Sequence, residues 1–309
     1  MDRLERVDTF QRRHRVPAFV YAVQKKFGDD NGGYLAALIT YYGFLSIFPL
    51  LLAGFTIAAY VLSGDASAVH TVEKHLGAYP ILGPAAQELE GKQLQGSPVA
   101  LVAGVLGLLW GATGLAQAVQ HTMDEAWNVP VAERKGMAGR LVRGFSWYAV
   151  FALGIVASTF LTSLGSIFNW AGGPALSALL ALVLNVALFW VSFWIVSPPG
   201  TNLRQLMPGA IFAGLVWTIL TTVAIGLTHK LAHTNTLYGS FAPVLALLAF
   251  LYLAARITIY SVEANVVAAE RLWPRSLTNK NLGPADRKQL TNLARRSRTV
   301  EAETVTVEL

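Results

Sequence analysis

The 309-residue chain contains no cysteine, which excludes disulfide bonds, thiolate metal sites and a cysteine nucleophile. Charge is also scarce, because only 14% of the residues are Asp, Glu, Lys or Arg, against about 25% in a typical soluble domain. The longest gap covers residues 144–203, where 60 residues pass without one such side chain. A soluble domain must solvate its outward faces, so these gaps exclude that class over most of the chain.

The uncharged windows predict an all-α, polytopic membrane protein, since about 20 apolar residues cross a bilayer core of about 30 Å as a helix. Adjacent prolines at 198 and 199, which lack amide donors, close the second half of the longest gap, and a turn at 169–174 divides it. We expect six spans, near residues 35–62, 98–121, 145–168, 175–196, 208–228 and 241–262. Asn185, the isolated amide of the fourth span, is expected to hydrogen-bond a neighbouring helix.

Lys and Arg residues are distributed very unevenly between the two sides of this arrangement. Twenty of them fall in the N-terminal segment, the second and fourth loops and the tail, and three fall in the opposite loops. Because cytoplasmic loops carry the excess of Lys and Arg, both termini are predicted to be cytoplasmic. No apolar signal core precedes the first span, which is therefore expected to act as an uncleaved anchor.

Three regions are expected along the chain. They are an N-terminal cytoplasmic segment (1–34), a transmembrane domain (35–265) with an external loop (63–97) carrying short helices, and a basic cytoplasmic tail (266–309). Residues 16–27 gather apolar side chains on one helical face, which predicts an interfacial helix lying on the cytoplasmic surface. In the tail we expect one helix that begins near Pro284, followed by a disordered end.

Small residues form a stripe along the second span, at Gly104, Gly107, Gly111 and Gly114. Such a stripe lets another helix backbone approach closely; a glycine-lined conduit is the alternative. In the first span Pro49 removes a backbone hydrogen bond and predicts a kink, with Tyr41 and Tyr42 two turns before it. The kink is either a shape feature or, as in some transporters, part of a binding site.

One face of the last span is polar, and its members are Tyr252, Arg256, Tyr260, Glu263 and, at the cytoplasmic border, Asn265. An ionisable residue within a membrane normally faces the bundle interior and has a partner, so this face is a candidate polar pathway. Alternatively, Arg256 reaches the cytoplasmic headgroups and Glu263 is already interfacial.

Neither catalytic nor metal-binding nor cofactor-binding residues are expected. Metal-assisted phosphodiester cleavage needs clustered carboxylates and histidines, whereas His229 and His233 have no acidic residue between them. A glycine-lysine phosphate loop is missing too. Topology and anionic headgroups already account for the basic segments, so no nucleic-acid partner is expected.

Several motifs resemble those of the YihY/BrkB family of bacterial inner-membrane proteins, once labelled ribonuclease BN. The resemblance covers about residues 16–269. The motifs are Ala36-Ala37-Leu38-Ile39-Thr40-Tyr41-Tyr42, Phe48-Pro49-Leu50-Leu51, Pro208-Gly209-Ala210, Tyr238-Gly239-Ser240-Phe241-Ala242 and Glu263-Ala264-Asn265.

This resemblance implies six spans, both ends inside and an inner-membrane location. It also implies a part in envelope properties, with export of an envelope lipid or amphiphile as the leading activity and anionic membrane lipids as the expected partners. The alternative is a structural or partner-binding component of the envelope, and a homo-oligomer or an envelope protein partner stays open.

Overall fold

The computed structural model describes residues 3–61, 98–167, 173–231, 242–278, 282–300 and 302–307. Within these residues the regular structure is helical throughout, which confirms the all-α class. The elements are α1 (Arg3–Arg13), α2 (Arg15–Asp29), α3 (Gly32–Val61), α6 (Pro98–Ala126), η1 (Val131–Glu133), α7 (Met137–Ile167), α8 (Gly173–Val196), η2 (Leu203–Leu206), α9 (Met207–Leu231), α10 (Ala242–Glu270) and α11 (Pro284–Arg296).

Each predicted span coincides with a long helix. Four helical segments in the described chain are apolar and long enough to cross a membrane: Val102–Ala126, Ala178–Val196, Leu203–Thr221 and Val244–Glu270. The other two predicted spans fall on α3 and α7, which run for 30 and 31 residues. At 1.5 Å per residue, either exceeds a bilayer core of about 30 Å. The six-span count stays a prediction, and the 63–97 loop and the 169–174 turn lie largely outside the described residues.

The chain divides into two compact units. The first contains Met1–Ala36, Val119–Thr218 and Arg256–Leu309, and the second contains Ala37–Ala118 and Ile219–Ala255. Four helices, α3, α6, α9 and α10, contribute residues to both units.

In the first unit α8 contacts both α7 and α9 through close approaches. A Cβ atom added at Gly214 of α9 would lie 2.9 Å from the backbone nitrogen of Val186 in α8. Asn185 donates a hydrogen bond of 3.0 Å to Thr218 Oγ1, so its predicted interhelical role is confirmed. A Pro-Pro-Gly turn follows α8, with Gly200 at φ +90°, a conformation that favours glycine.

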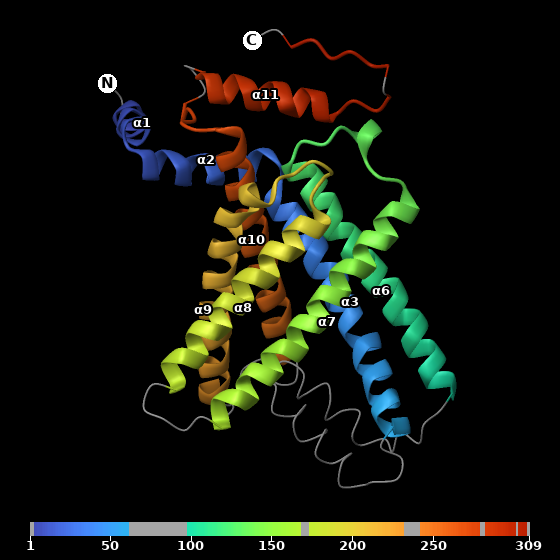
Figure 1. Cartoon of the computed structure of the whole chain (residues 1–309). Coiled ribbons are helices and arrows are strands. Elements are labelled where there is room, and N and C mark those ends of the chain that lie inside the picture. Colours follow the sequence, from blue (N-terminus) through green and yellow to red (C-terminus); the bar gives the residue numbers. More distant parts are fainter. Residues whose placement is uncertain are drawn as a thin grey trace. The chain divides into compact units, whose positions relative to one another are not determined.

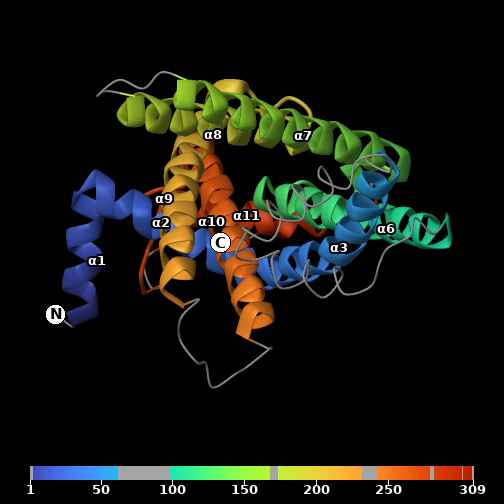
Figure 2. The same ribbon diagram turned by 90° about the horizontal axis from the view of Figure 1, so that it is seen from below.

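The N-terminal helices and the tail helix belong to the same unit. In Figure 1, α2 lies across the end of α10, near the level where α9 begins, and α11 lies above α2. The view from below in Figure 2 shows that α1 turns away from α2 at an angle. The predicted helices over 16–27 and from Pro284 are confirmed, whereas α1 was not anticipated from the sequence. The described residues 302–307 form no regular structure.

In the second unit the small-residue stripe of α6 lies against α3. A Cβ atom added at Gly111 would lie 2.9 Å from Ser46 Oγ and 3.0 Å from Ser46 Cα. One at Gly107 would lie 3.1 Å from Pro49 Cγ, and Gly114 lies against the ring of Tyr42. The backbones of the two helices therefore approach closely along this stripe.

Candidate functional site

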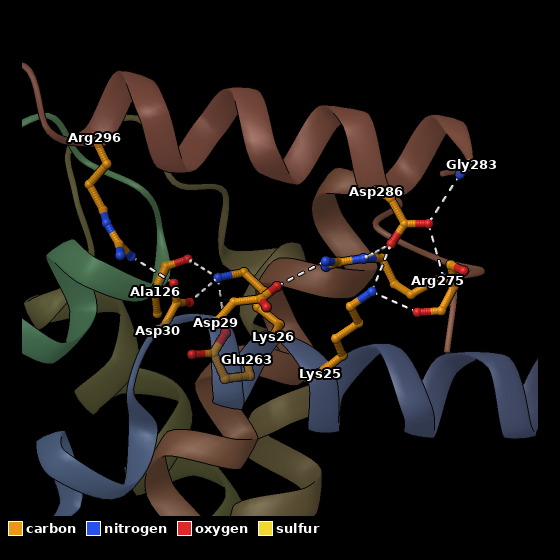
Figure 3. A network of polar contacts seen from close by, with 11 residues as sticks. Lys25, Lys26, Asp29, Asp30, Ala126, Glu263, Arg275, Gly283, Asp286 and Arg296 are labelled. Atoms are coloured by element: carbon orange, nitrogen blue, oxygen red, sulfur yellow. Dashed lines mark hydrogen bonds and ion pairs between the residues drawn. The ribbon is translucent and has the colours of Figure 1, made fainter. Parts of the chain in front are cut away.

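The polar face of α10 is the starting point for the site, because it contacts α2 inside the first unit. Glu263 has a fully buried side chain, and its Oε2 lies 3.1 Å from Nζ of Lys26. Lys26 is itself fully buried and also pairs with Asp30, one turn further along α2. Its third acceptor is the carbonyl oxygen of Ala126, at 2.8 Å. The ammonium group thus donates hydrogen bonds to Asp30 and to the Ala126 carbonyl oxygen and forms an ion pair with Glu263 (Figure 3).

This arrangement places a lysine on the buried side of α2, and the interfacial position of the helix stays a prediction. The helix buries Ala18, Ala22 and Lys26, which follow one another at intervals of four residues. Of the apolar side chains within 16–27, it also buries Val23 and Phe27, whereas Val20 is 61% exposed. Burial disfavours the charged ammonium, but the nearby carboxylates of Glu263 and Asp30 outweigh burial and raise the pKa of Lys26 above its ordinary value of 10.5. Lys26 is therefore a buried cation at neutral pH.

A second polar residue of α10 holds the beginning of α9. Oδ1 of Asn265 accepts a hydrogen bond of 2.6 Å from the backbone N–H of Gly209. A Cβ atom at Gly209 would lie 2.6 Å from Asn265 Nδ2 and would collide with the carbonyl oxygen of Ser261, so glycine is required for this approach. Two sequence motifs, Pro208-Gly209-Ala210 and Glu263-Ala264-Asn265, therefore meet at this contact.

The remaining members of the face in this unit contact α2 through aromatic rings. Tyr260 stacks on Phe27 with ring centroids 4.1 Å apart, and its hydroxyl donates a 2.7 Å hydrogen bond to Gln24 Oε1. Arg256 places its guanidinium carbon 5.5 Å from the centre of the Phe27 ring, within the range of a cation–π contact. Nη2 of Arg256 also donates to Tyr260 Oη at 3.4 Å. Tyr252, further along the face, belongs to the second unit and is 37% exposed.

An apolar groove opens next to these aromatic contacts, with a volume of about 280 Å³. It is lined by Phe19, Val20, Val23 and Gln24 of α2, Pro208 and Phe212 of α9, and Tyr260 and Ala264 of α10. The polar side chains of the lining are Gln24 and Tyr260, which hydrogen-bond each other. The volume lies near the lower end of small-molecule pockets, roughly 300–1,000 Å³.

Ion pairs continue from Asp30 towards the tail and the second loop. Nη1 of Arg296, in α11, lies 2.6 Å from Asp30 Oδ1 and donates to the carbonyl oxygen of Glu125 at 2.9 Å. The Glu125 carboxylate also receives Nε of Arg296 at 3.1 Å and Nη2 of Arg134 at 2.7 Å. With Lys26 and Glu263 this makes a row of six alternating charges, which we call the charge ladder.

The charge ladder joins four segments that are far apart in sequence. Its members come from the N-terminal segment, the region around the second loop, the end of α10 and the tail. Figure 3 shows four of them, Lys26, Asp30, Glu263 and Arg296. These are the segments that the Lys and Arg distribution predicts to share one side of the membrane. Which side that is stays a prediction.

A second polar cluster fastens the beginning of α11 to α2. Asp286 accepts from Arg275 Nε at 2.7 Å and from the backbone N–H groups of Ser276 and Gly283 at 3.0 and 3.1 Å. Burial alone would raise the pKa of the Asp286 carboxyl, but these hydrogen bonds outweigh it and hold the pKa below its ordinary value of 3.8. Lys25 of α2 completes the contact, at 3.2 Å.

The kink candidates of α3 lie in the second unit. Pro49 sits inside a helix that continues on both sides of it, and Ser46 Oγ donates to the Tyr42 carbonyl oxygen at 2.7 Å. Tyr41 is 56% exposed and its ring meets that of Tyr42 edge-on, with centroids 5.2 Å apart. A shallow hollow beside Tyr42 is lined by Leu109, Trp110, Thr113, Gly114 and Gln117 of α6.

Sequence reasoning singled out Arg256, Tyr260, Glu263 and Asn265 but missed the partners of the first three on α2 and of Asn265 on α9. Lys26 was not singled out within the predicted interfacial helix, and the available signal was the spacing of Ala18, Ala22 and Lys26. In the described parts of the chain, no three histidine, aspartate or glutamate side chains gather closely enough to hold a metal ion.

The comparisons with known proteins agree with this picture of a membrane protein. The YfkH protein of Bacillus subtilis, named ribonuclease-like, is 23% identical over 82% of this chain and 96% of its own length. The inner membrane protein YhjD of Escherichia coli is 22% identical, with 86% of both chains covered. A UPF0761 membrane protein of Alcanivorax borkumensis is 22% identical over 82% of this chain and 60% of its own length. No solved structure matches the chain.

Residues 23–285 match the family described as Virulence factor BrkB, a span that contains α10, the second half of α2 and five of the six members of the charge ladder. The match includes both motifs that meet at Gly209 and Asn265. The helices and the relatives together identify an integral membrane protein, and the chain belongs to the virulence factor BrkB family.

Proposed function

We propose that this protein resides in the bacterial inner membrane and transports an envelope lipid or a related amphiphile without catalysing a chemical reaction. The observation that carries the proposal is the groove between α2, α9 and α10. Its walls are almost entirely apolar, and they are built from two membrane helices and a helix that precedes the first span. A hydrocarbon tail matches such a lining, since the transfer of apolar surface out of water is favourable.

Arg256 supports an amphiphile over a purely apolar ligand. Its guanidinium lies one helical turn from Tyr260, which lines the groove, and it carries a permanent positive charge. An anionic headgroup close to Arg256 would find a bidentate partner. The polar face of α10 would then have two roles. Arg256 would contact the ligand, while Glu263 holds α2 and Asn265 holds α9.

The proposal is tested by purified protein in vesicles, with transbilayer movement of fluorescent phosphatidylglycerol followed by quenching from outside. Val20→Trp fills the groove from the exposed side of α2, and it is expected to slow the movement. Val16→Trp, one turn earlier on the same helix and 73% exposed, is the matched control because Val16 does not line the groove. Arg256→Leu should also slow the movement, and Arg256→Lys should restore little of it if the contact is bidentate.

A structural role in the envelope is the second candidate, favoured by the close contacts of Gly107 and Gly111 with α3. The same vesicles decide between the two roles. No protein-dependent movement of any bacterial lipid class would overturn the transport proposal and leave the structural one. Equal rates for Val20→Trp and Val16→Trp would overturn the assignment of the groove.

A further inference from the structure

One face of the N-terminal helix α1 is held by hydrogen bonds to the rest of the first unit. Gln11 donates a 2.7 Å hydrogen bond to the carbonyl oxygen of Arg275, and Asp8 accepts one of 3.0 Å from the backbone N–H of Leu277. Arg12 pairs with Asp8 at 3.0 Å on the same helix. These contacts fix which side of α1 is turned away from the protein.

The exposed side of α1 combines apolar and basic side chains, with Arg6 and Arg13 opposite Asp8 and Gln11, and with Val7 at its edge, about 40° from Gln11 around the helix axis. At 100° per residue, Arg6, Val7 and Arg13 lie within about 60° of Phe10 around the helix axis. Phe10 is 59% exposed and Val7 is 54% exposed. Arg6 and Arg13 are also exposed, and neither makes an ion pair with another residue in the described ranges. A phenylalanine held in water between two unpaired arginines indicates a partner that is apolar and anionic at once.

α1 lies where it can contact an apolar and anionic surface next to the membrane spans. α1 is seen nearly end-on in Figure 1, just above α2, and lengthwise in Figure 2. α2 continues the exposed apolar surface with Val16 and Val20, and Val20 lines the groove together with Phe212 of α9. The exposed side of this pair of helices is thus continuous with the side surface of a membrane span.

We propose that the face of α1 formed by Arg6, Val7, Phe10 and Arg13 docks on the anionic headgroups of the bilayer in which the protein is embedded. Phe10 and Val7 enter the boundary between headgroups and acyl chains, and the two guanidinium groups contact lipid phosphates. The match of charge selects this occupant over a second copy of the chain, because two copies would bring four arginines together.

The absence of cysteine makes the test direct, since a single introduced thiol can be labelled alone. Val7→Cys, carrying an environment-sensitive fluorophore, reports on the docking face and leaves Phe10 and both arginines in place. Glu5→Cys, also exposed on α1 but on another side of the helix, is the matched control. Both are measured in the full-length protein in vesicles of phosphatidylcholine, with and without phosphatidylglycerol.

The Val7→Cys label is expected to shift to the blue and to be quenched by nitroxide-bearing lipids, more strongly with phosphatidylglycerol and more weakly at high salt. Replacing Arg6 and Arg13 by Ala should lower the ratio of lipid-contacting to water-exposed label by roughly 30-fold, at about 1 kcal/mol for each basic residue near an anionic surface. The label on Glu5→Cys should stay accessible to a water-soluble quencher throughout.

Equal quenching of the two labels by lipid nitroxides would overturn the proposal. A Val7→Cys label that is buried equally with and without phosphatidylglycerol, and in the double arginine variant, would also overturn it. That result would show that a protein surface covers this face. If added RNA protected the label and anionic lipid did not, the occupant would be a nucleic acid.

Discussion

Replacing Lys26 by methionine is the sharpest test of the charge ladder. The substitution keeps the length of the side chain and its helix propensity, but it leaves Glu263 and Asp30 buried without the ammonium between them. Asp30 still has Arg296 at 2.6 Å, whereas among the described residues Lys26 is the cation that reaches Glu263. Removing one partner of a buried ion pair costs about 3–5 kcal/mol of stability.

The double variant Lys26→Met with Glu263→Gln separates this charge effect from a loss of packing. It removes both members of the pair, so no uncompensated charge stays buried at α10, and it should be more stable than Lys26→Met alone. Lys25→Met is the matched control on α2, because Asp286 retains Arg275 at 2.7 Å when Lys25 is lost. The control is expected to cost about 1 kcal/mol.

These free energies of unfolding are measured by denaturing the purified protein in mixed micelles and following tryptophan fluorescence. The reasoning would be refuted if Lys26→Met unfolded at the same denaturant concentration as Lys25→Met. It would also be refuted if the double variant were less stable than Lys26→Met, because the cost would then come from lost contacts and not from a stranded charge.

Three further predictions follow from single positions. Gly209→Ala should destabilise the protein by about 1–3 kcal/mol, because the new Cβ would collide with the Ser261 carbonyl oxygen in α10. Gly28→Ala is the control and should be neutral or stabilising, because no atom lies within 4 Å of its new Cβ. Thermal unfolding in detergent compares the two variants. Because folding lowers the pKa of Asp286, the contribution of its carboxylate to stability is complete above pH 3.8 and is lost as the pH falls through the pKa of the folded protein. Proteolysis of α11 should therefore accelerate in this acidic range, and Asp286→Asn should remove the pH dependence. A cysteine introduced at Lys135 should react only with reagents that reach the cytoplasm, and labelling from outside would contradict the orientation.

The spans could be predicted because a single physical requirement fixes them. A helical segment inside the bilayer core must consist of about 20 mostly apolar residues with few or no charges. The fourth span was predicted to end at residue 196 on this ground, and α8 ends at Val196. The last span was predicted to end near 262, and the helix that contains it, α10, continues to Glu270. Its polar residues do not stop the helix, because Glu263 and Asn265 find partners on α2 and α9.

The buried lysine could not be predicted by the same reasoning. Patterning assigns Lys to water, and only Asp30, four residues away, offers a local partner for Lys26. The other two acceptors, Ala126 and Glu263, lie 100 or more residues further along the chain, so the sequence around α2 contains no sign of them. Helix α1 was not predicted for a related reason, since the hydrogen bonds that hold it in place go to backbone groups of Arg275 and Leu277, which are distant in sequence.

The charge ladder also has a consequence for biosynthesis. Asp30 precedes the first predicted span, and Arg296, which neutralises it, follows every one of the spans in the sequence. While a ribosome is still delivering the membrane helices, Asp30 can pair with Lys26, but the guanidinium that completes the row has not yet been made. The tail therefore acts as a final fastening in assembly. A reporter fused to a chain truncated before α11 would probe a protein whose N-terminal and second-loop segments still lack that fastening.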